Sequence, residues 1–202
     1  MNVHSFLLGA IMSEPIEDKR TRILDATEKL LAKDGFQGLS MKKLAKEADV
    51  AAGTIYRYFE DKHHLIEETR LYVSQRAADY IQSNLTDDMS LKEQYRTIWL
   101  NIWNLNSTES AVKSHFLYEQ FDYTNESKIF QLEKEMFYKV VDLFETGKAQ
   151  GLFKPLEGYI LFSVSLDSSI ALARKQKNRC IQMDSNAIEQ AIEASWDAII
   201  QH

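Results

Sequence analysis

A short stretch between residues 40 and 62 holds the side chains whose chemistry is most informative. It combines hydroxyls, which can donate to phosphate oxygens, with Lys and Arg, which can neutralise phosphate charge or read base edges. Small residues stand beside them and would let the backbone approach a duplex closely. The residues expected to contact nucleic acid are Ser40, Lys42, Lys43, Ala52, Gly53, Thr54, Tyr56, Arg57, Tyr58 and Lys62.

The members of this set have different expected roles. Arg57 carries a planar fork of donors that matches two acceptors on guanine, so we expect it to read base sequence. Lys62 is expected to hold a backbone phosphate. Three members also have a purely structural interpretation: Tyr58 could pack inward, Lys43 could be a solvated surface charge, and Gly53 could serve close helix packing.

The remaining reactive side chains do not predict catalysis. His63 and His64 are adjacent, so on a helix they point about 100° apart and cannot hold one metal ion together. The single cysteine, Cys180, follows a basic run and has no neighbouring histidine. The sequence also lacks a glycine-rich phosphate loop and a nucleophile elbow. We therefore expect no enzyme activity, no metal site and no cofactor.

The segments that must position residues 40–62 show the spacing of apolar residues that is typical of α-helices. Apolar residues recur at spacings of three and four over most of the chain, and strict alternation never persists. This pattern predicts an all-α fold of about nine helices. They are expected to span roughly residues 17–33, 41–48, 51–58, 62–83, 91–105, 106–121, 125–147, 156–176 and 184–201.

The two short helices near the N-terminus have the proportions of a helix-turn-helix. Ser40 is placed to cap the first of them, and Asp61 is placed to cap the longer helix that follows. In such a unit the second short helix enters the major groove while the first lies across the DNA backbone. The predicted contact residues lie on these helices and their flanks.

Residues 39–62 read LSMKKLAKEADVAAGTIYRYFEDK and are followed by Leu65 and Ile66. This segment closely resembles the DNA-binding module of the TetR family of bacterial regulators, and GTIYRYFxxK is among the more specific short motifs of such regulators. The resemblance covers residues 17–66, about a quarter of the chain. It implies a homodimer that binds a pseudo-palindromic operator in double-stranded DNA and represses transcription until an effector binds.

The resemblance also implies a division of the chain. We expect an N-terminal extension over residues 1–14, a helix-turn-helix domain over 15–62, and a ligand-binding and dimerisation domain over 63–202. No motif in the last of these identifies the effector. The alternative is a TetR-like regulator without a small-molecule effector, controlled by a protein partner or acting as an activator.

Aromatic residues gather in the second half of the chain, and some are expected to line an effector site. Trp99 and Trp103 lie one helical turn apart, and large indoles seldom pack without leaving a cleft. Asp167 interrupts a mainly apolar helix and could orient a ligand by charge. Such a site would suit a lipophilic cation or a planar drug, although an aromatic stripe is more often part of a core. The expected ligand-binding residues are Trp99, Trp103, Phe116, Phe137, Tyr138 and Asp167.

The last predicted helix carries a continuous stripe with the spacing i, i+3, i+4, i+7 and i+11. Two helices from each chain can form a four-helix interface between protomers, and we expect this stripe to belong to it. Burial of the stripe within one subunit would produce the same pattern. Its members are Ile188, Ala191, Ile192, Ser195 and Ile199.

The charge distribution agrees with a DNA partner better than the total does. The 202 residues include 24 basic and 30 acidic side chains, which gives a net charge of −6. Residues 1–60 hold nine of each sign, so the whole acidic excess lies beyond them, in the part that need not touch DNA. A single cysteine and the lack of an apolar run of roughly 18 to 20 residues predict a cytoplasmic protein that is not in a membrane.

Overall fold

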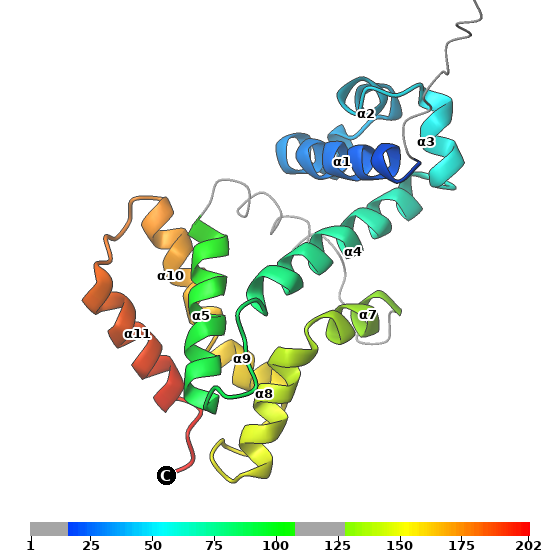
Figure 1. Cartoon of the computed structure of the whole chain (residues 1–202). Helices are drawn as coiled ribbons and strands as arrows, with labels where there is room; N and C mark the ends of the chain where they lie inside the picture. Colours follow the sequence, from blue (N-terminus) through cyan, green and yellow to red (C-terminus); the bar gives the residue numbers. More distant parts are fainter. Residues whose placement is uncertain (1–15, 108–127) are drawn as a thin grey trace, which may run out of the picture.

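The computed structural model describes residues 16–107 and 128–202, which form an all-α fold, as predicted (Figure 1). Within these ranges no helix is both long and apolar enough to cross a lipid bilayer. The helices are α1 (Ile16–Gly38), α2 (Met41–Glu47), α3 (Ala52–Tyr58), α4 (Lys62–Ile81), α5 (Leu91–Ser107), α7 (Lys128–Met136), α8 (Tyr138–Ala149), α9 (Gly158–Val164), α10 (Asp167–Lys177) and α11 (Ser185–Asp197).

The N-terminal helices begin at the capping side chains. Ser40 Oγ accepts a hydrogen bond from the backbone N–H of Lys43 at 3.2 Å, and Asp61 Oδ1 accepts one from the N–H of His64 at 2.8 Å. Both predicted N-caps are confirmed. The helical span of α1 continues past its predicted end but is kinked at Gly35, whose φ of 67° is readily adopted only by glycine.

Two hydrophobic cores lie toward opposite ends of α4 (Figure 1). The N-terminal core joins α1, α2, α3 and the first part of α4, and it draws on α4 as far as Val73. The C-terminal core takes Ile81 from the end of α4 and combines it with side chains of α5 and α8 to α11. Because α4 contributes to both cores, the domain boundary between residues 62 and 63 stays a prediction.

Helix α5 lies at the centre of the C-terminal core. Its Tyr95 is fully buried and donates its hydroxyl to Ser195 Oγ at 2.8 Å, while its ring meets that of Trp196 edge-on at 5.1 Å. Burial raises the pKa of Tyr95 to about 12, so the hydroxyl stays protonated and keeps its donor role at neutral pH. These contacts tie α5 to α11.

Two of the nine predicted helices are each divided in two, and the one expected over 106–121 lies almost entirely outside the described residues, so the described part of the chain holds ten helices. The helix expected over 125–147 is divided at Phe137, where the side chain of Gln82 accepts a hydrogen bond from the N–H of Lys139 at 2.7 Å. The helix expected over 156–176 is divided at Ser165, whose hydroxyl donates to the carbonyl of Leu161 at 2.5 Å. Such local serine bonds compete with regular helix geometry.

The C-terminal residues are tied to the loop between α8 and α9. The N–H of Lys154 donates to the carbonyl of Ile199 at 2.8 Å, and the N–H of Gln201 donates to the carbonyl of Leu152 at 2.9 Å. Ile199 and Phe153 are both buried at this junction. The end of the chain therefore covers one side of the C-terminal core.

Gly147 offers a test of this packing. A Cβ at Gly147 would lie 2.0 Å from the ring of Phe153, which is held edge-on between Phe144 and Trp196. We expect Gly147→Ala to lower the free energy of unfolding by about 1 to 3 kcal/mol, despite the better helix propensity of alanine. Gly158→Ala is the matched control, because nothing lies within 4 Å of a Cβ there. Equal urea midpoints for the two variants would contradict this account.

Candidate nucleic-acid interface

Helices α2 and α3 are each seven residues long and are joined by a tight turn. Asp49 in this turn has a φ of 52°, a region that Asp and Asn enter more readily than other non-glycine residues. The N–H of Val50 closes the turn by donating to the carbonyl of Ala45 at 3.0 Å. Helix α3 buries only Ile55, so most of its surface is left for a partner.

Most of the predicted contact residues lie on the exposed surface of α2, α3 and their flanks. Tyr56 keeps 56% of its surface exposed, which leaves a large ring and its hydroxyl available for contact. Nothing lies within 4 Å of a Cβ at Gly53, so packing inside the chain does not account for this glycine. The exposed members are Ser40, Lys42, Lys43, Ala52, Gly53, Tyr56 and Arg57; Thr54, Tyr58 and Lys62 are partly buried.

Two predicted contact residues also have partners inside the chain. Lys43 Nζ lies 3.3 Å from Asp34 Oδ2, in an exposed ion pair that contributes little to stability. The ring of Tyr58 packs against the N-terminal core, 6.3 Å from the ring of Phe59. Both residues keep a structural role alongside the predicted contact with DNA.

Lys62 is more engaged within the chain than its predicted role requires. Its Nζ donates to the carbonyl of Phe36 at 2.9 Å and lies 4.6 Å from the centre of the Phe36 ring. This contact ties the start of α4 to the segment after the kink in α1. A phosphate contact by Lys62 stays a prediction, and it would have to add to this bond or replace it.

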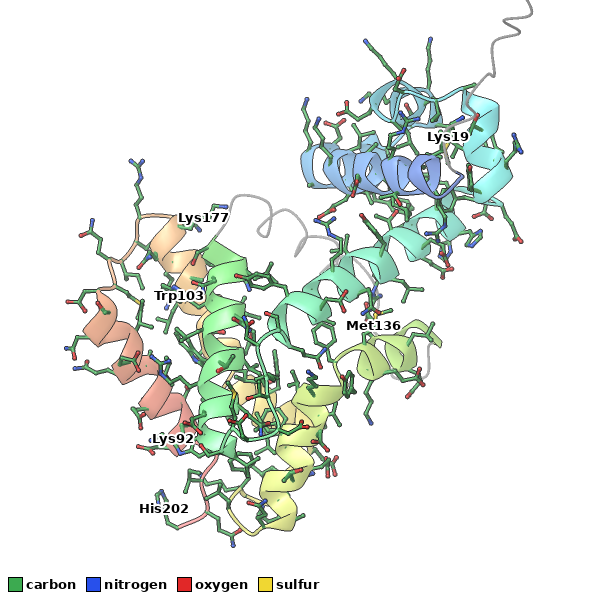
Figure 2. All side chains as sticks on the ribbon, in the orientation of Figure 1. Lys19, Lys92, Trp103, Met136, Lys177 and His202 are labelled. Atoms are coloured by element: carbon green, nitrogen blue, oxygen red, sulfur yellow. The ribbon has the colours of Figure 1, made fainter. Side chains whose placement is uncertain are left out.

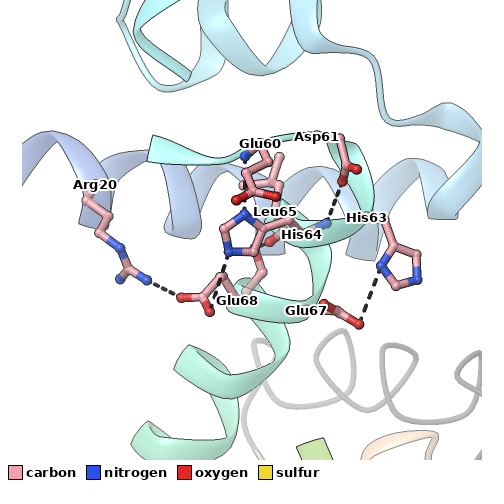
Figure 3. Close-up of polar contacts among 9 residues, drawn as sticks. Arg20, Glu60, Asp61, His63, His64, Leu65, Glu67 and Glu68 are labelled. Carbon is pink, nitrogen blue, oxygen red and sulfur yellow. Dashed lines mark hydrogen bonds and ion pairs between the residues drawn. The ribbon is translucent and has the colours of Figure 1, made fainter. Parts of the chain in front are cut away.

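A set of polar contacts fixes the junction between α3 and α4 (Figure 3). His64 Nδ1 accepts a hydrogen bond from the N–H of Glu60 at 3.2 Å, and Glu68 accepts one from Arg20 on α1. The Arg20 guanidinium also lies over the buried ring of Phe59, 5.7 Å from its centre. The end of α3 is therefore attached to both α1 and α4.

Two cations of α1 that were not among the predicted contact residues lie next to α3. The spacing of Lys19 and Arg22 on the polar side of α1 was the available signal. Lys19 belongs to the N-terminal helices (Figure 2). Both residues line a small cleft of about 240 Å³ whose walls are Lys19, Arg22, Asp49, Val50, Ala51 and Thr54.

Comparisons with known proteins identify this arrangement. The family model described as "Bacterial regulatory proteins, tetR family" matches residues 23–69, and "Tetracyclin repressor-like, C-terminal domain" matches residues 90–200. An uncharacterized HTH-type transcriptional regulator of Haemophilus influenzae is 34% identical over 189 residues, which cover 93% of this chain and 99% of that protein. The chain belongs to the TetR family of transcriptional regulators.

A solved structure extends the likeness to the whole fold. A TetR family protein from Vibrio parahaemolyticus, described as a putative transcriptional regulator, is 53% identical, has a TM-score of 0.84, and matches over 91% of this chain and 100% of its own. The transcriptional repressor KstR of Mycolicibacterium smegmatis is 48% identical over 54 residues, 27% of this chain and 26% of that protein. This TetR-family chain is therefore a DNA-binding regulator and not an enzyme.

The predicted effector residues of this TetR-family chain do not form one group. Trp99 and Trp103 stack at 5.7 Å in the C-terminal core, and Trp99 Nε1 donates to Ser168 Oγ at 3.1 Å. Phe137 packs against the same core. Phe116 lies outside the described residues.

The two other predicted effector residues are exposed. Tyr138 is 60% exposed and lines an open, mostly charged groove along α7 and α8, whose lining residues include neither tryptophan of α5. Asp167 begins α10 beside Ser168, and although the residue is exposed, neighbouring protein atoms keep some water from its carboxyl group and so raise the pKa of that group. The described residues therefore do not form a single site lined by all of these side chains.

The predicted dimer stripe on and just after α11 divides into buried and partly exposed positions. Ile192, Ser195 and Ile199 are buried within the single chain, where α11 packs against α5 and α10. Because these side chains already have partners in their own subunit, they cannot also form a surface for a second copy. Ile188 and Ala191 are partly exposed and remain available.

Variants of Arg57 and Lys62 test the assignment of base reader and phosphate contact. Arg57→Ala is expected to cost about 1 to 3 kcal/mol of binding and to relax base preference at one position. Lys62→Ala should weaken binding to all duplexes about equally and reduce the salt slope by about 1. Fluorescence anisotropy with selected and scrambled duplexes, over a range of salt, separates the two effects. If Arg57→Ala weakened binding to all duplexes equally and the lysine variant changed base preference, the assigned roles of the two residues would be wrong.

Proposed function

We propose that this regulator is a repressor that binds a pseudo-palindromic operator in double-stranded DNA as a homodimer. The observation that carries the proposal is the face of α3, where Tyr56 and Arg57 are exposed while Ile55 holds the helix to the core. The KstR relatives, which share the DNA-binding part of the chain, are named transcriptional repressors. The protein would act in the cytoplasm, where its DNA lies.

A homodimer follows from the requirements of DNA binding. One chain presents one α3, which can read only one half-site. Two chains related by a two-fold axis would read half-sites about 34 to 36 Å apart, one turn of the duplex. This symmetry requires each protomer to use the same surface patch on its partner.

The outer side of α11 is the dimer surface that we favour. It carries alanines at the spacing i, i+4, i+7 and i+11, and small side chains allow two helices to approach closely. Partly exposed Ile188 lies at the edge of this surface. The alanines are Ala187, Ala191, Ala194 and Ala198, of which Ala194 is the most exposed.

Release by a small molecule is the second part of the proposal. Stacked indoles in the C-terminal core and the carboxylate of Asp167 would suit a lipophilic cation. The competing function is a regulator without an effector. It is favoured by the nearly complete burial of Trp99 and Trp103, which are 0% and 5% exposed.

Sedimentation velocity with a selected operator tests the dimer. Selection from a random duplex library should yield a palindrome, and two chains should bind each copy of it. Ala194→Arg is expected to give monomers that have lost tight operator binding, because two bulky charges would meet across the two-fold axis. Ala149→Arg, at an exposed position at the end of α8, is the matched control and should leave a dimer. A wild-type monomer at micromolar concentration would refute the proposal.

Titration with tetraphenylphosphonium, a lipophilic cation, tests the effector. Saturable quenching of tryptophan fluorescence, together with a weaker operator complex, is the expected result. Asp167→Asn should raise the concentration needed for half-maximal quenching by about tenfold, equivalent to about 1.4 kcal/mol. Unchanged fluorescence and unchanged operator affinity would favour the regulator without this class of effector.

A further inference from the structure

An ion pair shielded from solvent joins α4 to α7. Arg70 Nε donates to Glu133 Oε1 at 2.7 Å, and Arg70 Nη2 donates to Glu133 Oε2 at 2.6 Å. Ser74, one turn further along α4, donates its hydroxyl to Glu133 Oε1 at 2.8 Å. The side chains of Arg70 and Glu133 are only 5% and 11% exposed. Two parallel charge-assisted bonds fix both the distance and the orientation of the partners.

A second attachment lies at the end of α4. Gln82 Nε2 donates to the carbonyl of Met136 at 2.8 Å, and Gln82 Oε1 accepts from the N–H of Lys139 at 2.7 Å. Met136 marks the end of α7, where it meets α8 (Figure 2). Gln82 follows Arg70 by about 18 Å along the helix, at 1.5 Å per residue. A single attachment would allow α4 to pivot, whereas two separated attachments fix the direction of the helix.

The helix-turn-helix unit moves with α4. Its core includes buried side chains from the first part of α4. Polar contacts extend this attachment on the outer surface: Tyr72 donates to Asp25 Oδ1 at 3.0 Å, and Arg76 donates to Glu28 Oε2 at 3.0 Å. The direction of α4 relative to α7 therefore determines where α3 lies relative to the C-terminal domain.

We propose that the Arg70–Glu133 pair determines which half-site spacing the dimer accepts, and this rests on the dimeric DNA binding proposed above. A tilt of about 10° in the 20-residue α4, roughly 30 Å long, moves its end by about 5 Å. One base pair changes the half-site separation by about 3.4 Å and turns one half-site by about 35° around the duplex axis, so a neighbouring spacing requires α3 both to shift and to turn. Loss of the pair would thus admit neighbouring spacings. Arg70 and Glu133 are positioning residues that do not touch DNA.

The double variant Arg70→Met/Glu133→Leu tests the proposal. It replaces the pair by apolar side chains of similar length and so leaves no uncompensated buried charge. The probe is the palindrome that the wild type selects from a random duplex library, together with versions that have one base pair inserted or removed at its centre. The wild type should lose about tenfold or more in affinity with each altered spacing, and the double variant about threefold or less. Its preferred half-site sequence should stay the same.

Two further variants make the outcome decisive. Lys148→Met/Glu145→Leu removes an ion pair that lies within α8 alone, and it should keep the wild-type spacing preference. Glu133→Gln retains the shape of the acceptor but weakens its bonds to Arg70, so it should give an intermediate preference even if the double variant fails to fold. A folded dimer of either Glu133 variant with the wild-type spacing preference would overturn the proposal. A wild-type protein that selects no palindrome would instead refute the function on which it rests.

Discussion

Helix α4 is buried against two different cores, and this double burial constrains the rest of the structure. Its first part supplies apolar side chains to the N-terminal core, and its last residue, Ile81, reaches the C-terminal one. Within the first of these stretches Arg70 would be costly to bury alone, since an unpaired charge away from water is strongly destabilising. Glu133 on α7 satisfies it. The placement of the DNA-binding unit therefore depends on polar pairing as well as on apolar contact.

The N-terminal fold could be predicted because its signals are local. Ser40 and Asp61 cap helices within three residues of themselves, and the apolar period assigns Ile55 to the core. The helix breaks at Phe137 and Ser165 could not be predicted in the same way, because the apolar period continues through both. One break is stabilised by Gln82, which lies far away in sequence, and Arg70 and Glu133 are separated by 63 positions.

The candidate site was predictable where geometry follows from the helix-turn-helix alone. The exposed positions on α3, such as Tyr56 and Arg57, follow from which side of the helix is apolar. The position of the Lys62 side chain could not be predicted in this way, because its bond to the Phe36 carbonyl depends on the kink in α1. The stripe on α11 could not be interpreted from the sequence for a different reason. The same spacing of apolar residues is expected whether a helix is buried within its own subunit or between two subunits. Only the packing of α11 against α5 distinguishes them.

The tie between the C-terminal residues and the loop before α9 has a practical consequence. The carbonyl of Ile199 and the N–H of Gln201 both bond to that loop, so truncation before them would uncover buried Phe153. His202 itself is exposed, at the end of the molecule away from α3 (Figure 1). Immobilising the protein through a tag beyond His202 would therefore keep the core closed and present the DNA-binding surface to solution.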